Sequence, residues 1–285
     1  MRSPTTAEAY CDALGGVAGE LPLERHAVTH GEKTYPLPRL ASPEQGGPLL
    51  LISAGFHGDE RAGPLSILEH LEEIVSYARE RGVGLILYPL CNPSGFEAGT
   101  RYNIEGDRGE LGNNDFLRYE LPDGRIVGDV GRGRPFSRWR WSSDPALGAR
   151  LPAETARLHA LLRREPLEHV AAAVDLHQDH FTTVDRPLSY GYAFGDLSRY
   201  APILAVVGRE IALARHLSVC AGQPDATTTD GAGLIVRHDG TLPDLFHRLG
   251  ARHGVTVETT GNTPLGLACR VNLIWIRGVI ELLSR

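Results

Sequence analysis

Hydrophobic residues along the chain fall into two kinds of segment, and the two kinds alternate. The segments 48–56 and 83–91 are apolar almost throughout, which is typical of strands that are covered on both faces. Between them, apolar residues recur at helical spacing over 63–81, and this predicts a helix that ends at Gly82. This order, strand then helix then strand, indicates a repeating unit built around a buried sheet.

The alternation resumes after position 150. The predicted helices are 153–164, 198–216, 242–250 and 264–283, and the predicted strands are 169–176, 188–194, 233–237 and 255–259. A short helix ending at Gly15-Gly16 and a hairpin over 23–38 precede the first buried strand. Alternating buried strands and helices predict an α/β fold with a mixed, mostly parallel central sheet and helices on both faces. We expect residues 1–44 to pack as a helix and hairpin on a single main domain, 45–285.

The stretch 94–150 departs from this pattern. It is rich in glycine and arginine, carries Phe136, Trp139 and Trp141, and has few periodic segments. We therefore expect a long loop region, which in a compact domain is usually functional. Its tryptophans and arginines could form a recognition surface, because both residue types anchor interfaces. Packing over the rim of a site is the favoured interpretation.

Composition narrows the class of protein. Of the 285 residues, 42% are hydrophobic and 22% charged, which is ordinary for a globular protein. The formal net charge of −6 disfavours nucleic acid as a partner, because phosphate attraction needs a basic face. No apolar stretch is long enough for a membrane span, and the first residues do not resemble a signal peptide. The four cysteines form no CxxC pair, so we expect a cytoplasmic protein with reduced thiols.

Polar residues that could bind a metal follow two of the buried strands. His57 and Glu60 come three residues apart after the strand 48–56, and His177 follows the strand 169–176. Two histidines and a glutamate are the three-ligand set of many catalytic zinc sites. The alternatives are a solvated loop with a helix-capping carboxylate and a structural histidine; His180 competes with His177 for the ligand role. Asp175 could orient a ligand or form a capping hydrogen bond.

Three further positions could act on a substrate. Glu258 ends the strand 255–259, where burial would raise its pKa and suit it to take a proton from water. The alternative is an ordinary glutamate on the surface of an edge strand. Arg101 could stabilise a developing oxyanion, and Asn113 could hydrogen-bond a substrate carboxylate or amide; alternatively, both belong to a solvated loop.

These motifs, taken in order, resemble a known family. A strand then HGDE (57–60), a strand then NPSG (92–95), GTRYN (99–103), a strand then DLH (175–177) and a strand then VET (257–259) resemble the zinc carboxypeptidases. They also resemble its deacylase branch, the succinylglutamate desuccinylase and aspartoacylase group. The resemblance spans about 45–285 and implies a zinc carboxypeptidase-like catalytic domain that holds one zinc ion per chain.

The resemblance implies a role for each matching residue. His57, Glu60 and His177 correspond to the zinc ligands, Glu258 to the general base and acid, and Arg101 to the arginine that polarises the scissile carbonyl. Two further matches are less complete. Asn113 matches the family's Asn-Arg pair, but Asn114 replaces the arginine that normally holds the substrate's free carboxylate, so Arg108, Arg132 or Arg134 would have to supply that charge. In addition, no tyrosine follows Tyr200, although peptide-cleaving members usually have one shortly before the catalytic glutamate.

Three functions follow as hypotheses. The first is a zinc-dependent amide hydrolase acting on a small peptide or peptide-like amide. The second keeps the chemistry but removes an acyl group from an N-acyl amino acid. The third is an inactive relative that binds a ligand, against which the presence of all three ligands and the base argues. Partners beyond a small molecule or short peptide are not expected, and the sequence leaves the oligomeric state open.

Overall fold

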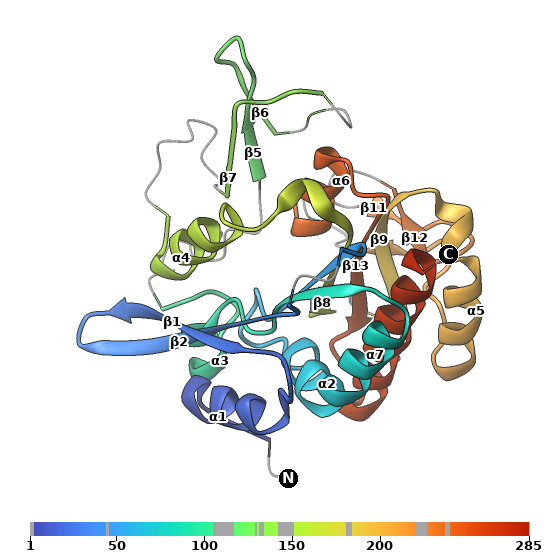
Figure 1. Ribbon diagram of the computed structural model, residues 1–285. Helices are drawn as coiled ribbons and strands as arrows, with labels where there is room; N and C mark the ends of the chain where they lie inside the picture. The colour runs from blue at the N-terminus through green and yellow to red at the C-terminus, as the bar shows by residue number, and fades with distance from the viewer. Residues whose placement is uncertain are drawn as a thin grey trace.

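The computed structural model describes residues 3–43, 46–104, 117–128, 130, 134–141, 151–180, 184–219, 227–236 and 240–284. An eight-stranded sheet runs through this part of the chain in the order β1-β2-β4-β3-β8-β13-β9-β12 (Figure 1). Its strands are β1 (Leu23–His30), β2 (Lys33–Ala41), β3 (Leu49–Ala54), β4 (Gly84–Tyr88), β8 (Val170–Asp179), β9 (Ser189–Gly195), β12 (Leu234–Ile235) and β13 (His253–Thr260).

The centre of the sheet is parallel and both sides are mixed. β4, β3, β8 and β13 pair in parallel, while β9 lies antiparallel to β13 and parallel to the short β12. The predicted hairpin is β1 and β2, and β2 joins it to β4. The predicted α/β class, with a mixed and mostly parallel sheet, is confirmed.

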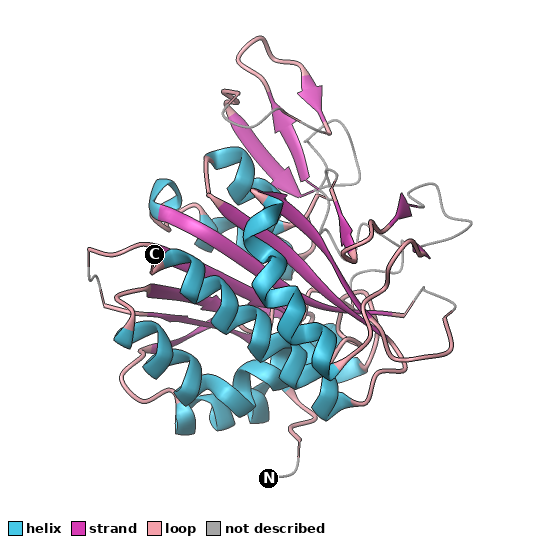
Figure 2. Ribbon diagram, turned by 90° about the vertical axis from the view of Figure 1, so that its right-hand side faces the viewer, coloured by secondary structure: helices cyan, strands magenta, loops and turns pink. Residues whose placement is uncertain are grey.

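Helices cover both faces of the sheet (Figure 2). One large apolar cluster joins the sheet to α1 (Ala7–Val17), α2 (Ala62–Glu80), α5 (Ala201–Glu210) and α7 (Leu265–Leu283). A second cluster on the opposite face joins it to α4 (Ala153–Leu162) and α6 (Leu242–Leu249). None of the helices in the described ranges is both long enough and apolar enough to cross a membrane.

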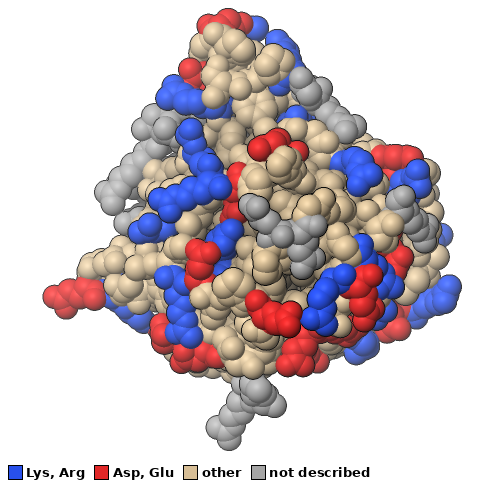
Figure 3. Space-filling model, viewed as in Figure 1, with Lys and Arg blue, Asp and Glu red and all other residues tan. Residues whose placement is uncertain are grey.

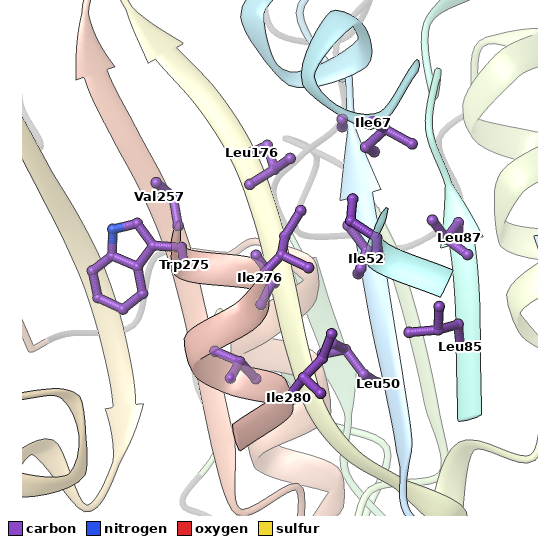
Figure 4. Close-up of a cluster of buried hydrophobic side chains, with 14 of the residues drawn as sticks. Leu50, Ile52, Ile67, Leu85, Leu87, Leu176, Val257, Trp275, Ile276 and Ile280 are labelled. Atoms are coloured by element: carbon purple, nitrogen blue, oxygen red, sulfur yellow. The ribbon is translucent and has the colours of Figure 1, made fainter. Parts of the chain in front are cut away.

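The C-terminal helix α7 anchors the core. Its Trp275, Ile276 and Ile280 are buried in the large apolar cluster. Val257 lies near Trp275, and Leu176 and Leu50 lie near the two isoleucines (Figure 4). Burying each such side chain stabilises the fold by roughly 1.5–3 kcal/mol relative to leaving it exposed. Packing against α7 therefore helps to hold in place the strands that carry polar groups at their carboxyl ends.

The described parts of the segment 94–150 contain more secondary structure than the sequence predicts. α3 (Pro93–Ala98) begins it, and β5 (Leu117–Glu120), β6 (Ile126–Val127) and β7 (Arg138–Trp141) form a separate three-stranded sheet. Trp139 is buried in the second apolar cluster, and the ring of Phe136 packs edge-on against Tyr119. These contacts support packing rather than a recognition surface for those two side chains. The strands are too short to reveal a period in the sequence.

Two predicted helix boundaries are wrong. The helix expected over 198–216 ends at Glu210, because the backbone of Ile211 is extended and His216 has a positive φ of 51°. The N-terminal helix continues past Gly15-Gly16 to Val17. β10 (Ser218–Val219) and β11 (Thr227–Thr228) form a further small sheet.

Candidate metal centre

Three buried side chains meet at the carboxyl ends of β3 and β8. His57 and Glu60 lie in the turn between β3 and α2, and His177 lies on β8. Their ligand atoms all lie within 4.8 Å of one another. His57 Nδ1 is 2.5 Å from Glu60 Oε1, and His177 Nδ1 is 3.0 Å from Glu60 Oε2. The structure thus brings together the three residues that the sequence analysis selected as ligands.

Glycines allow the turn that carries His57 and Glu60. Gly55 has a positive φ of 68°, which side-chain-bearing residues rarely adopt. A Cβ on Gly58 would lie 2.0 Å from the carbonyl carbon of Gly95, so only glycine fits there. The Gly58 amide also donates to the carbonyl of Arg101 at 3.1 Å. The turn that carries His57 and Glu60 is therefore held against the loop that carries Arg101.

Asp175 and Ser53 hold His177 from behind. His177 Nε2 lies 3.0 Å from Asp175 Oδ2, and the Ser53 hydroxyl donates to Asp175 Oδ1 at 2.7 Å. A carboxylate on one imidazole nitrogen keeps its proton there and leaves Nδ1 available as a metal ligand. Asp175 is fully buried inside β8 and so is not at the end of a helix, and its contact with His177 supports the interpretation that it orients this side chain.

The charges around the cluster suit a cation. Burial alone would raise the pKa of Glu60, but His57 and His177 outweigh it and hold that pKa well below its usual range. Burial alone would lower the pKa of His177, but Asp175 and Glu60 raise it well above its usual value. Two imidazoles and an ionised carboxylate, with backing from Asp175, are a donor set that fits Zn²⁺.

Glu258 stands beside this cluster. It lies on β13 directly opposite His177 on β8, and neighbours in register on adjacent strands face the same side of the sheet. β13 is an interior strand between β8 and β9, so the alternative of a glutamate on an edge strand is wrong. Burial raises the pKa of Glu258 well above its usual value; His177 opposes this shift and Glu60 adds to it. A half-buried carboxylate with a raised pKa suits proton transfer.

Arg101 also reaches the cluster, where its guanidinium contacts the carboxylate of Glu60. Its Nη1 donates to Glu60 Oε1 at 2.9 Å, and its side chain keeps 23% of its surface exposed. Asn92 stabilises this arrangement, because its Nδ2 donates to the carbonyls of Phe56 and Arg101. The guanidinium therefore lies at the cluster of His57, Glu60 and His177, on a side chain that is partly exposed.

Most residues that the sequence offered for substrate binding fall outside the described part of the chain. Arg108, Asn113, Asn114 and Arg132 lie outside the described residues. Arg134 is exposed. His180, the competing ligand candidate, is also exposed and does not belong to the cluster of His57, Glu60 and His177.

The structure adds residues that the sequence analysis did not select. The backbone amide of Gln178 on β8 donates to Glu60 Oε2 at 3.0 Å and so helps to fix the Glu60 carboxylate. Tyr190 on β9 lies opposite Glu258, and its hydroxyl donates to Asp179 Oδ2 at 2.6 Å. Strand alternation could have shown that Asp179 shares a face with His177, but the predicted strand ended at 176. Nothing in the sequence places Tyr190 next to Glu258, because the pairing of β9 with β13 is non-local.

Comparisons with known proteins found a family profile and solved structures that are similar to this chain. Residues 46–184 match the family profile described as the succinylglutamate desuccinylase/aspartoacylase catalytic domain. A crystal structure of a candidate metallopeptidase from Shewanella amazonensis is 26% identical, with a TM-score of 0.66, over 98% of this chain and 94% of that chain. No curated protein matches the chain significantly.

Two more distant structures share the fold. A succinylglutamate desuccinylase/aspartoacylase from Rhodobacter sphaeroides is 17% identical, with a TM-score of 0.51, over 92% of this chain and 64% of that one. A metallo-carboxypeptidase from Burkholderia cenocepacia is 14% identical, with a TM-score of 0.57, over 96% and 68%. The resemblance to the zinc carboxypeptidases and their deacylase branch is confirmed.

Proposed function

We propose that this relative of the zinc carboxypeptidases, near their succinylglutamate desuccinylase/aspartoacylase branch, is a zinc-dependent hydrolase of amide bonds. The observation that carries the proposal is the meeting of His57, Glu60 and His177 beside the half-buried carboxylate of Glu258. Three protein ligands that leave a position open are typical of catalytic rather than structural zinc. When bound here, zinc would acidify a water molecule and polarise the substrate carbonyl.

The chain's own residues would carry the proton. Glu258 takes the proton from the attacking water, because burial raises its pKa and makes it a stronger base than an exposed glutamate. As the C–N bond breaks, Glu258 gives this proton to the leaving nitrogen. Water thus supplies a hydroxyl group to the acyl carbon and a hydrogen to the amine.

Arg101 would stabilise the negative charge that develops on the carbonyl oxygen. Its Nη1 already lies at the cluster, bonded to Glu60, and the side chain keeps 23% of its surface exposed, so a substrate can approach it there. The link from Asn92 to the Arg101 carbonyl keeps the loop in place as this charge forms.

The substrate would be a small peptide or a peptide-like amide in the cytoplasm. Structural similarity to metallocarboxypeptidases supports this class. The alternative substrate is an N-acyl amino acid, which the match to the succinylglutamate desuccinylase/aspartoacylase catalytic domain supports. On the face in Figure 3, acidic and basic side chains are interspersed, which suits a small substrate better than a polyanion.

The test begins with metal content. Purified wild type should contain about one zinc per chain, and His177→Ala should lose it, since three protein ligands hold the metal. His180→Ala is the matched control, because His180 is exposed and follows the same strand. Glu258→Gln should keep the metal and lose hydrolysis of N-acetyl amino acids and N-blocked dipeptides. A wild type that takes up no zinc, even when zinc is added, would overturn the proposal and leave an inactive binding protein.

A further inference from the structure

Three adjacent strands present one row of side chains next to the cluster of His57, Glu60 and His177. His177 on β8 is in register with Glu258 on β13, and Glu258 is in register with Tyr190 on β9. Side chains in register on neighbouring strands lie on the same face, with Cβ atoms about 4.5–5.5 Å apart. Glu258 is therefore the middle member of the row, between a metal-ligand candidate and a tyrosine.

The tyrosine reaches across the middle strand. Tyr190 belongs to β9, but its hydroxyl donates at 2.6 Å to Asp179, which belongs to β8. Because β13 lies between these strands, the phenol ring must cross over β13 to make this bond. Tyr190 and Asp179 keep only 2% and 6% of their surface exposed, so water competes little for the bond.

Glu258 has few polar contacts of its own to fix its direction. Its Oε2 is buried and makes no hydrogen bond to any residue that the structure describes. The backbone carbonyl of Glu258 is held by the Ser189 hydroxyl at 2.9 Å, but this contact does not orient the carboxylate. The direction of the carboxylate must therefore depend on the side chains packed next to it.

We propose that Tyr190 and Asp179 are positioning residues for Glu258. The hydrogen bond between them holds the phenol ring across β13 as a wall beside the carboxylate. The wall limits the rotamers of Glu258 and directs its carboxylate toward the cluster of His57, Glu60 and His177. This inference rests on the proposed hydrolase function, in which Glu258 takes a proton from the attacking water.

The test is a double-mutant cycle with a conservative control. Tyr190→Phe and Asp179→Ala each remove the hydrogen bond, and we expect each to lower kcat by roughly ten- to a hundredfold with little change in KM. The double variant should be no slower than the slower single variant, because both changes remove one interaction. Asp179→Asn keeps an acceptor oxygen for the hydroxyl and should restore most of kcat.

Metal content and thermal unfolding distinguish positioning from a general structural role. All four variants should contain as much zinc as the wild type and unfold cooperatively. The assay uses the N-acetyl amino acid or N-blocked dipeptide that the wild type hydrolyses fastest. The positioning role alone would be overturned if the effects of the two single variants on the activation free energy added up in the double variant. An Asp179→Asn variant as slow as Asp179→Ala would also overturn it. A wild type that hydrolyses no member of the panel would overturn the proposed function, and the positioning role with it.

Discussion

Removing the charge of Asp175 should weaken metal binding without removing a ligand. Asp175 is fully buried, and its two oxygens have separate partners: Oδ2 holds His177 Nε2 at 3.0 Å and Oδ1 accepts from Ser53 at 2.7 Å. In Asp175→Asn the amide oxygen can still face His177, and its NH₂ can donate to the Ser53 hydroxyl. The side chain then keeps its shape and its hydrogen bonds but loses its negative charge.

The expected loss follows from what the charge does. The carboxylate would make His177 a stronger donor to a bound metal, and changing such a partner typically costs 10- to 100-fold in metal affinity. We expect about tenfold for Asp175→Asn, or about 1.4 kcal/mol, because the hydrogen bond itself survives. Asp175→Ala should approach a hundredfold, since it also leaves His177 Nε2 and Ser53 without this partner.

The assay is a competition for zinc between the protein and a fluorescent chelator of known affinity. Ser53→Ala is the matched control, because it removes one bond to Asp175 but keeps the carboxylate on His177. It should change the zinc Kd less than either substitution at Asp175. If Asp175→Asn binds zinc as tightly as the wild type, the negative charge of Asp175 does not strengthen zinc binding by His177, and this reasoning fails.

Two other predictions follow from the same geometry. Without metal, Asp175 and Glu60 raise the pKa of His177 well above its usual value, so zinc must displace a proton from this side chain. Zinc should therefore bind more weakly as the pH falls below that raised pKa. Calorimetry in two buffers of different ionisation enthalpy should detect the released proton. A pH-independent Kd across pH 6–8 would contradict this. Gly58→Ala should destabilise the fold by about 1–3 kcal/mol in urea unfolding and reduce zinc content, because its Cβ would overlap Gly95. Gly16→Ala is its control: it is in α1 with nothing within 4 Å of the added Cβ and should stabilise slightly, whereas equal losses in both variants would show that the Gly58 contact is not special.

The convergence of the three ligand candidates could be predicted, because each was expected at the end of a buried strand. His57, Glu60 and His177 lie just beyond or at the carboxyl ends of β3 and β8, and parallel strands bring those ends to one edge of the sheet. Their types and order then indicate a His₂Glu site. The sequence also predicted the helices α2, α4, α6 and α7 to within a few residues, since their apolar periodicity is long enough to detect.

The surroundings of Glu258 could not be predicted in the same way. Glutamate after a short β-branched run is as typical of a surface edge strand as of a site, and only the strand order shows that β13 is interior. Its partner strand β9 precedes it by more than 50 residues and runs antiparallel, which reverses the order in which β9 residues meet β13. No local sequence pattern indicates this register, so the sequence could not predict that Tyr190 lies opposite Glu258.

This difference follows from how each group is held. The ligand candidates sit on or just after parallel neighbours, where strand direction alone determines that they converge. Glu258 is oriented across the junction where the sheet changes from parallel to antiparallel, so its environment depends on register as well as direction. A shift of one residue between β9 and β13 would turn Tyr190 to the opposite face and leave the metal ligands where they are. The proposed metal site therefore depends on strand direction, whereas the proposed proton-transfer group also depends on register. Substitutions that disturb the packing of β9 should impair hydrolysis while zinc binding persists.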